Sequence, residues 1–211
     1  MNNRTLLIDL QYFPSVDYVS SLIGRSNIVF AEYVSFRKMT FRNRTMISGA
    51  NGLINLTVPV NGGRDVKEKM NEVKIDNSQN WRTRHLRAII SSYNRSPYFE
   101  FFSDSLTSLF ESKTEKLQDW NLACLDWLIE NCGLEIQYSV LNEPPTQDSQ
   151  LEFDDLRDHF FPKLMKNRTS SILPYRQVFE ERFGFIPGLS ILDFLFCAGP
   201  AAVRNLGKND A

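Results

Sequence analysis

The chain has 211 residues, of which 42% are hydrophobic, so it can bury one substantial core. Its formal net charge of -1 gives no overall basic field to attract nucleic acid, although residues 37–95 are locally basic, so nucleic-acid binding is not the predicted function. Three cysteines without a Cys-x-x-Cys motif argue against a disulfide framework and a structural metal site, and no apolar run is long enough for a secretory signal or a membrane span. We therefore expect a cytoplasmic protein.

The chain begins with a predicted strand, loop, helix and strand in succession. Thr5–Asp9 predicts the first strand, Ser15–Leu22 a short helix and Asn27–Ala31 the second strand. In open α/β sheets such units place ligands at the carboxyl ends of the strands, which here are Asp9–Ser15 and Glu32–Phe36. The loop has neither a Gly-x-Gly-x-x-Gly nor a P-loop pattern, so dinucleotide and P-loop chemistry are not predicted.

The segment Phe36–Arg44 contains four cations and one amide within nine residues. If it were strand-like, Lys38, Arg42 and Arg44 would share one cationic face. Arginine forks suit carboxylate and phosphate oxygens, so this face predicts a site for an anionic ligand, with Lys38 and Arg44 as binding residues and Asn43 fixing orientation. A solvated basic edge strand is the alternative interpretation.

A hairpin and a short strand are predicted next. Thr45–Ile47 and Leu53–Val60 read as strands, and the Asn51-Gly52 pair between them is a strong hairpin signal. We expect this hairpin to extend the sheet as antiparallel strands. After a charged loop, Val73–Ile75 is a candidate short strand.

An arginine-rich helix is predicted over residues 81–94, before Pro97. Its helically spaced apolar residues form a predicted buried stripe of Leu86, Ile89, Ile90 and Tyr93. At about 100° per residue, Trp81 and His85 lie on one flank of this stripe and Arg87 on the other. A pocket can open at such a flank.

Two residues are candidates for acid and base chemistry. The ordinary pKa of a histidine is near 6.5, which suits His85 to this role, although a core-edge histidine with satisfied ring nitrogens is the structural alternative. Asp9, at the end of the first strand, is predicted to orient a ligand hydroxyl or a histidine, but it could equally cap the following turn. No nucleophile motif accompanies either residue.

The remaining chain is predicted to be mainly helical. Two helices are expected at Ser103–Ser112 and Lys116–Asn131, followed by a strand at Glu135–Val140. A Pro-Pro pair then separates an α/β core of residues 1–141 from a helical C-terminal appendage of residues 148–211 that packs on it. The predicted fold is thus α/β, with a mixed sheet begun by the strand-loop-helix-strand unit, flanking helices and a helical C-terminal segment.

An ordered set of short motifs runs from about Leu6 to Phe110. Its members are Tyr12-Phe13-Pro14 with Asp17-Tyr18, Phe36 and Lys38 with Asn43-Arg44, Leu56 to Val60, Trp81 with His85-Leu86-Arg87, and Tyr93 with Ser96-Pro97-Tyr98-Phe99. In this order they resemble the WbqC-like protein family, bacterial proteins whose genes often occur in O-antigen and surface-polysaccharide clusters. One departure is that relatives usually open the first loop with His-Gln-Pro, where this chain has Ile8, Asp9 and Leu10.

The resemblance implies a role in sugar or polysaccharide biosynthesis. Our leading hypothesis is a cytoplasmic transferase acting on an activated, possibly nucleotide-linked, sugar or related anionic precursor, with no cofactor indicated. Its predicted site consists of catalytic His85 and Asp9 and the substrate-binding residues Lys38, Asn43, Arg44, Trp81, Arg87 and Tyr98. The alternatives are a non-catalytic protein that binds an anionic metabolite, or a scaffold for an envelope-biogenesis partner bound through the C-terminal segment.

Overall fold

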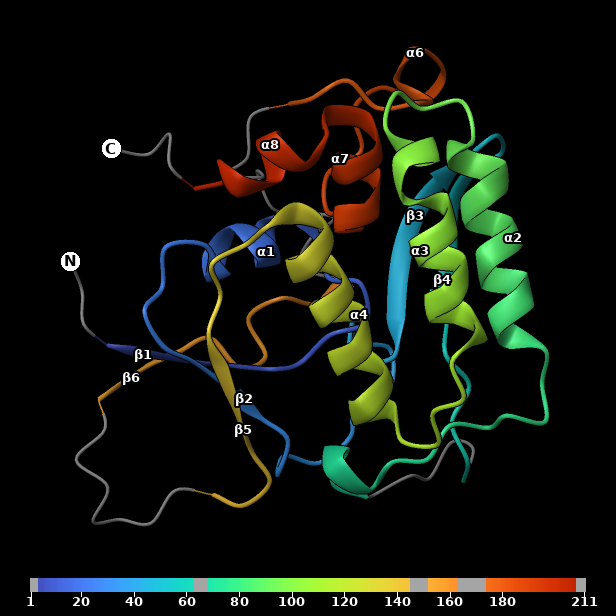
Figure 1. The fold of residues 1–211 in the computed structure, drawn as a ribbon. Coiled ribbons are helices and arrows are strands. Elements are labelled where there is room, and N and C mark those ends of the chain that lie inside the picture. The colour runs from blue at the N-terminus through green and yellow to red at the C-terminus, as the bar shows by residue number, and fades with distance from the viewer. Residues whose placement is uncertain (1–3, 63–67, 145–151, 163–173, 208–211) are drawn as a thin grey trace.

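The computed structural model describes residues 4–62, 68–144, 152–162 and 174–207, and it has the predicted α/β class (Figure 1). A parallel sheet of four strands has the order β5-β2-β1-β6. These strands are β1 (Thr5–Ile8), β2 (Ile28–Ala31), β5 (Tyr138–Leu141) and β6 (Phe153–Asp155). Strand β2 is buried along its whole length, as expected for a parallel strand covered on both faces.

The predicted strand-loop-helix-strand unit is confirmed. Helix α1 (Val16–Leu22) connects β1 to β2, and the Ser15 hydroxyl caps it by accepting the Tyr18 N–H. The parallel register pairs Ile8 with Phe30, so both strands end at the same edge of the sheet. The residues that follow them at this edge are Asp9 and Glu32.

The predicted hairpin forms, but it does not join the main sheet as expected. Strands β3 (Arg44–Gly49) and β4 (Gly52–Thr57) pair only with each other in a separate antiparallel sheet of the described structure. The turn depends on Gly52, whose φ of +105° suits a residue without a Cβ. Because β3 packs against α2 (Trp81–Tyr93) and α7 (Ile191–Ala198), helices rather than a neighbouring strand hold the hairpin in place.

The segment Phe36–Arg44 is not strand-like, so the prediction of one shared cationic face is wrong. The Thr40 hydroxyl donates to the Arg37 carbonyl at 2.8 Å, and Met39 has a left-handed φ of +63°. These features bend the chain into successive turns. The result separates two cations, because Lys38 is exposed whereas Arg42 is buried.

The predicted short strand at residues 73–75 is also wrong. Lys74 and Ile75 make only isolated bridges, to Lys116 and Val60. The short 3₁₀ helix η2 (Met70–Glu72) comes directly before this segment. The backbone of the segment therefore pairs with two different partners instead of one continuous strand.

The three long helices of the middle of the chain are confirmed. They are α2, α3 (Phe99–Glu111) and α4 (Leu117–Cys132), and α2 lies beside α3 (Figure 1). Gly133 ends α4 with a φ of +61°, a left-handed conformation that glycine adopts without steric cost.

The buried face of α2 is rotated from the predicted stripe. Ile90 is 38% exposed, whereas Trp81 and His85 are buried. The Trp81 ring packs edge-to-face on Trp120 of α4 with centroids 5.2 Å apart, and His85 bonds to Tyr12. These aromatic contacts place the predicted flank residues at the centre of the buried face.

The C-terminal region is helical, as predicted. Its described helices are α6 (Glu180–Phe183), α7 and α8 (Pro200–Arg204), and α7 contributes to the same hydrophobic core as the N-terminal strands. The boundary between a core of residues 1–141 and an appendage of residues 148–211 stays a prediction, although β6 of the latter lies in the main sheet beside β1. Within the described ranges, none of the helices has the length and apolar character to span a membrane.

Candidate functional site

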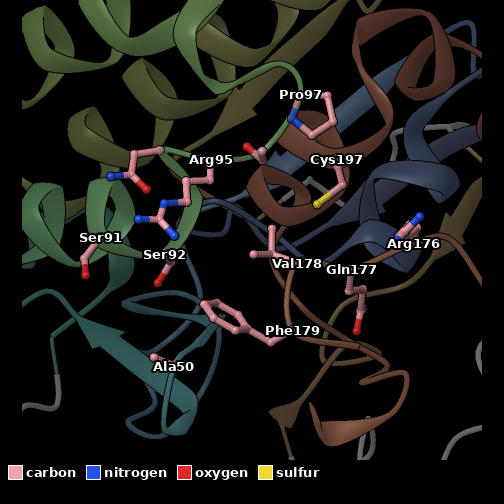
Figure 2. Close-up of a pocket in the computed structure, with 12 residues that line it drawn as sticks. Ala50, Ser91, Ser92, Arg95, Pro97, Arg176, Gln177, Val178, Phe179 and Cys197 are labelled. Atoms are coloured by element: carbon pink, nitrogen blue, oxygen red, sulfur yellow. The ribbon is translucent and has the colours of Figure 1, made fainter. Parts of the chain in front are cut away.

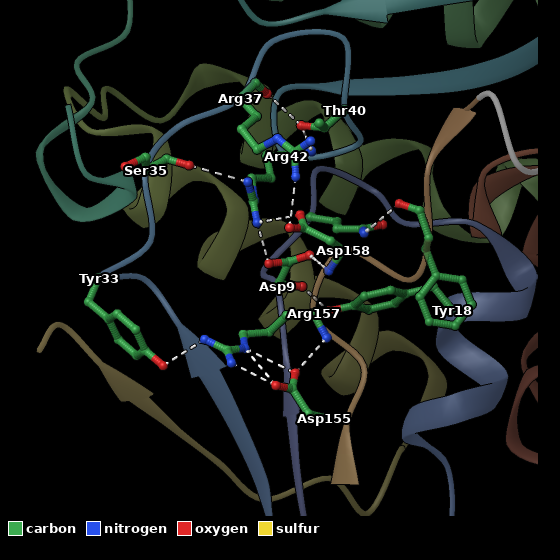
Figure 3. A network of polar contacts seen from close by, with 12 residues as sticks. Asp9, Tyr18, Tyr33, Ser35, Arg37, Thr40, Arg42, Asp155, Arg157 and Asp158 are labelled. Atoms are coloured by element: carbon green, nitrogen blue, oxygen red, sulfur yellow. Dashed lines mark hydrogen bonds and ion pairs between the residues drawn. The ribbon is translucent and has the colours of Figure 1, made fainter. Parts of the chain in front are cut away.

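Charged side chains gather at the carboxyl edge of the parallel sheet. Asp9 follows β1, Glu32 follows β2, Arg42 comes from the turns before β3, and Asp158 follows β6. We call these four residues the sheet-edge cluster; Figure 3 shows three of them, Asp9, Arg42 and Asp158, in one polar network. The position agrees with the predicted ligand edge, because the strands of an α/β sheet present their following loops there.

The centre of the cluster is a buried ion pair. Arg42 Nη2 donates to Asp9 Oδ1, and both side chains are nearly inaccessible, at 3% and 5% exposure. The second carboxylate oxygen of Asp9 accepts the N–H of Asp158 at 2.7 Å. The Tyr18 hydroxyl donates to the Asp9 carbonyl at 2.5 Å. Asp9 therefore joins β1, the Arg42 turn and the segment after β6.

The outer part of the cluster is a carboxylate held between two arginines. Asp158 Oδ1 accepts from Arg42 at 3.1 Å, and Oδ2 accepts from Arg37 at 2.8 Å. Asp158 and Arg37 are open to solvent, with side chains 42% and 57% exposed. Asp158 also has a left-handed φ of +56°, a conformation that costs a non-glycine residue about 1 kcal/mol or more. The surrounding contacts hold this residue in place.

Glu32 is the unusual member of the cluster. It is completely buried, and its carboxyl oxygens lack a hydrogen-bond partner of normal geometry in the described part of the chain. Burial raises the pKa of Glu32 to about 8, against the opposing effects of the Arg42 cation and the Leu10 amide, while the Asp9 carboxylate raises it further. At neutral pH the Glu32 carboxyl therefore holds its proton in most molecules.

His85, the predicted acid or base, lies in an aromatic environment instead. Its Nδ1 is 3.0 Å from the Tyr12 hydroxyl, and the Trp81 ring packs against it at 5.2 Å. The Tyr12 N–H donates to the Phe41 carbonyl, so Tyr12 connects His85 to the backbone of the cationic segment. Burial lowers the pKa of His85 to about 4, with a further lowering from the Arg84 cation, so the ring is neutral at pH 7. Its catalytic role stays a prediction.

The lowered pKa of His85 gives a pH-dependent contribution to stability. The unfolded chain binds a proton on this histidine below about pH 6.5 and the folded protein only below about pH 4, so stability falls as the pH drops through this window. We expect His85→Gln to reduce the loss of unfolding free energy between pH 7 and pH 5 by about 2 kcal/mol. Urea denaturation at both pH values measures this difference. If the unfolding free energy fell equally in the variant and in wild type, the lowered pKa of His85 would be contradicted.

The three predicted cations outside the cluster occupy separate places. Lys38 is exposed on the turn beside Arg37. Arg44 begins β3, half-buried, with Nη2 3.1 Å from the Met39 sulfur. Arg87 is exposed on α2. Lys38 therefore follows Arg37, which pairs with the cluster residue Asp158, whereas Arg44 and Arg87 lie on β3 and α2.

The remaining predicted binding residues make structural contacts. Asn43 is buried and its amide donates to the Val58 carbonyl at 3.0 Å. Trp81 is buried in the aromatic contacts described above. Tyr98 is half-buried against Gly199, where an added Cβ would lie 2.7 Å from the tyrosine ring. The substrate-binding roles of these three residues stay predictions.

Sequence reasoning singled out Asp9 but not the other members of the sheet-edge cluster. Arg42 was within the predicted cationic segment, and Glu32 began the predicted ligand-binding edge after the second strand, so both carried a signal. Asp158 carried none, because only the pairing of β6 with β1 brings it to this edge. Among the described residues, no group of three or more histidine, cysteine, aspartate or glutamate side chains is placed to hold a metal ion.

Comparison with known proteins gives one family and one distant relative. A model of the WbqC-like protein family matches residues 11–159, a range that includes Glu32, Arg42 and Asp158. A protein of Mycobacterium tuberculosis (strain ATCC 25618 / H37Rv), named "Uncharacterized protein Rv1507c", is 22% identical over 224 residues, which cover 94% of this chain and 95% of the relative. No solved structure matches the chain significantly.

Proposed function

This chain belongs to the WbqC-like protein family, and from that premise we propose that it is a transferase acting on an activated sugar or related anionic precursor in surface-polysaccharide biosynthesis. The precursor binds at the sheet-edge cluster. The observation that carries this proposal is the Asp158 carboxylate between the guanidinium groups of Arg37 and Arg42. A position that accommodates one carboxylate between two arginines has the charge and geometry to accommodate a carboxylate or phosphate of a ligand.

Binding of the precursor exchanges one anion for another. Its anionic group takes the place of the Asp158 carboxylate on Arg37 and Arg42, and the exposed Lys38 on the same turn adds a further positive charge. Because Asp158 is partly exposed and its backbone is strained, its displacement costs less than that of a buried, relaxed residue. The buried pair of Asp9 and Arg42 keeps its own contact during this exchange.

Glu32 supplies the acid and base chemistry of the proposed reaction. With a pKa of about 8, its carboxyl can give or accept a proton near neutral pH, which an ordinary glutamate does poorly. Displacement of Asp158 opens the cluster from the solvent side, where the precursor lies. Protonated Glu32 then gives its proton to the leaving-group oxygen as the bond from that oxygen to the sugar breaks, and Arg42 stabilises the carboxylate left on Glu32. The acceptor hydroxyl forms the new bond to the sugar and loses its proton to solvent.

The proposal is tested by thermal unfolding with UDP-glucose, UDP-glucuronate, glucose 1-phosphate and inorganic phosphate. A ligand that binds the folded state raises its stability, by about 2.7 kcal/mol at a hundred times the dissociation constant. We expect one sugar-containing probe to raise the melting temperature of wild type and to lose this effect in Arg37→Ala.

A matched control for this test is Arg4→Ala. Arg4 lies before β1, has a side chain 55% exposed and pairs with Glu152 at 3.1 Å, so it resembles Arg37 in exposure and pairing but lies at the opposite end of the strand. The stabilising probe should act on Arg4→Ala as on wild type. Failure of every probe at millimolar concentration, or an equal shift in Arg37→Ala, would contradict binding at the cluster.

A non-catalytic protein that binds an anionic metabolite is the second candidate. It is favoured by the cysteines, because burial raises the pKa of all three thiols, to about 12 for Cys132 and Cys197, so none of them is a reactive thiolate at neutral pH. The variant Glu32→Gln separates the two candidates. A transferase should keep its affinity for the stabilising probe and lose transfer of the sugar to an acceptor, whereas a binding protein should show no transfer in either form.

A further inference from the structure

A cleft lies away from the sheet-edge cluster. It has a volume of about 730 Å³ and opens between the C-terminal end of α2 and residues 176–179, with Cys197 of α7 also in its lining (Figure 2). Cavities of about 300–1,000 Å³ are typical of small-molecule sites. None of the predicted site residues lines this cleft.

The walls of the cleft are fixed to each other by a buried carboxylate. Asp193 of α7 accepts from the Tyr93 hydroxyl at 2.8 Å and from the Tyr175 hydroxyl at 2.7 Å, so it joins α2 to the opposite wall. In that wall the Gln177 side chain both donates to the Ile186 carbonyl and accepts the Ile186 N–H, each at 2.8 Å. The cleft is therefore formed before a ligand arrives, which lowers the entropy cost of binding.

Arg95 is one of the charged residues that line this cleft. Its side chain is exposed, and no residue in the described part of the chain bonds or pairs with its guanidinium. Arg95 lies two residues past the end of α2, where the helix dipole favours a cation, but its N–H donors remain available. The other arginine of the lining, Arg176, forms an ion pair with the exposed Glu181 at 3.3 Å.

Apolar side chains complete the lining. The half-buried Phe179 and Val178 belong to the wall opposite α2, and in Figure 2 the guanidinium of Arg95 lies across the cleft from the Phe179 ring. Ser91 lies on the α2 side and offers a hydroxyl. The cleft thus combines a free cation, an aromatic face and a hydroxyl within one cavity.

We propose that this cleft binds a nucleotide-sized anion, with its planar ring on Phe179 and its phosphate on Arg95. The guanidinium fork matches two phosphate oxygens, and the ring gains from stacking on an aromatic side chain. The volume is large enough for both parts and the sugar between them. This proposal is independent of the proposed function, because the two sites share no residue.

The test is titration calorimetry of the full chain with UMP, uridine, ribose 5-phosphate and inorganic phosphate. We expect UMP to bind more tightly than any of its fragments. Arg95→Ala should weaken UMP at least about tenfold, the loss expected for a charge-assisted contact of about 1.4 kcal/mol. Phe179→Leu should weaken UMP while leaving the affinity for ribose 5-phosphate unchanged.

Two controls locate the effect. Arg84→Ala changes an exposed arginine at the other end of the same helix, which contacts Gln79, and should leave UMP affinity unchanged. Arg37→Ala should also leave it unchanged, so failure at the sheet-edge cluster and failure at this cleft are distinguishable. No UMP binding at millimolar concentration, or equal binding by Arg95→Ala, would overturn the proposal.

Discussion

Replacing Arg42 with methionine should lower the free energy of unfolding by about 3 to 5 kcal/mol, the cost of removing one partner from a buried ion pair. Methionine keeps much of the apolar stem of the arginine side chain. It leaves the Asp9 carboxylate, whose side chain is 5% exposed, without its buried cation. The change also removes contacts to Asp158 and to the Ser35 carbonyl. Chemical denaturation of wild type and variant at pH 7 measures the loss.

The matched control is Arg37→Met, which removes an arginine from the same Asp158 carboxylate. Because this side chain is 57% exposed, we expect a loss of at most about 1 kcal/mol. Combining Arg42→Met with Asp9→Leu should recover part of the stability, since it removes the charge that was left unpaired. Similar losses for Arg42→Met and Arg37→Met would show that burial of the pair does not determine its contribution.

Glu32→Gln should stabilise the protein, and the gain should grow with pH. The pKa of Glu32 is raised from 4.5 to about 8, so the folded state holds a proton that the unfolded chain releases. Stability from this residue is complete below about pH 4.5 and falls by about 1.4 kcal/mol per pH unit until about pH 8. Glutamine resembles the protonated form and has no such loss. Between pH 5 and pH 8 the variant should therefore gain about 3 to 4 kcal/mol relative to wild type.

Urea denaturation of both proteins across this range measures the gain. The control is Glu100→Gln on α3, which makes the same substitution on an exposed side chain, so a gain of the size expected for buried Glu32 should not appear. From about pH 4.5 to 6.5, a rise in pH lowers the stability contributed by Glu32 and raises that contributed by His85. Each effect is therefore measured as the difference in unfolding free energy between the variant and wild type. If the difference in unfolding free energy between Glu32→Gln and wild type stayed the same at every pH, it would contradict the raised pKa of Glu32.

Local patterns in the sequence predicted most elements of the fold. The first strand, helix and second strand, the Asn51-Gly52 hairpin and the long helices α2 and α4 each have a signal within a few residues, such as an apolar period, a cap or a turn pair. The errors at residues 36–44 and 73–75 have a common cause. Both segments make backbone contacts with distant partners, and those contacts are absent from any local pattern.

The candidate site was predicted less completely than the fold. The carboxyl edge of the first two strands was the expected ligand position, and Asp9 is there with the buried pair. The apolar spacing of α2, however, placed His85 at the edge of the buried stripe. The tertiary contacts with Tyr12 and Trp81 instead bury it and lower its pKa.

The sequence by itself determined the family, the α/β class and the concentration of cations before β3, because these depend on residue order and local periodicity. Only the tertiary structure decided that Arg42 is the buried cation and that Asp158 contacts it at the carboxyl edge of the sheet. The same holds for Glu32, whose carboxyl oxygens lack a normal hydrogen-bond partner within the described ranges. The physical reason is that burial and pairing depend on residues far apart in the chain. Arg42 and Asp158 are 116 positions apart in the sequence, and local periodic patterns do not indicate contacts over such a separation.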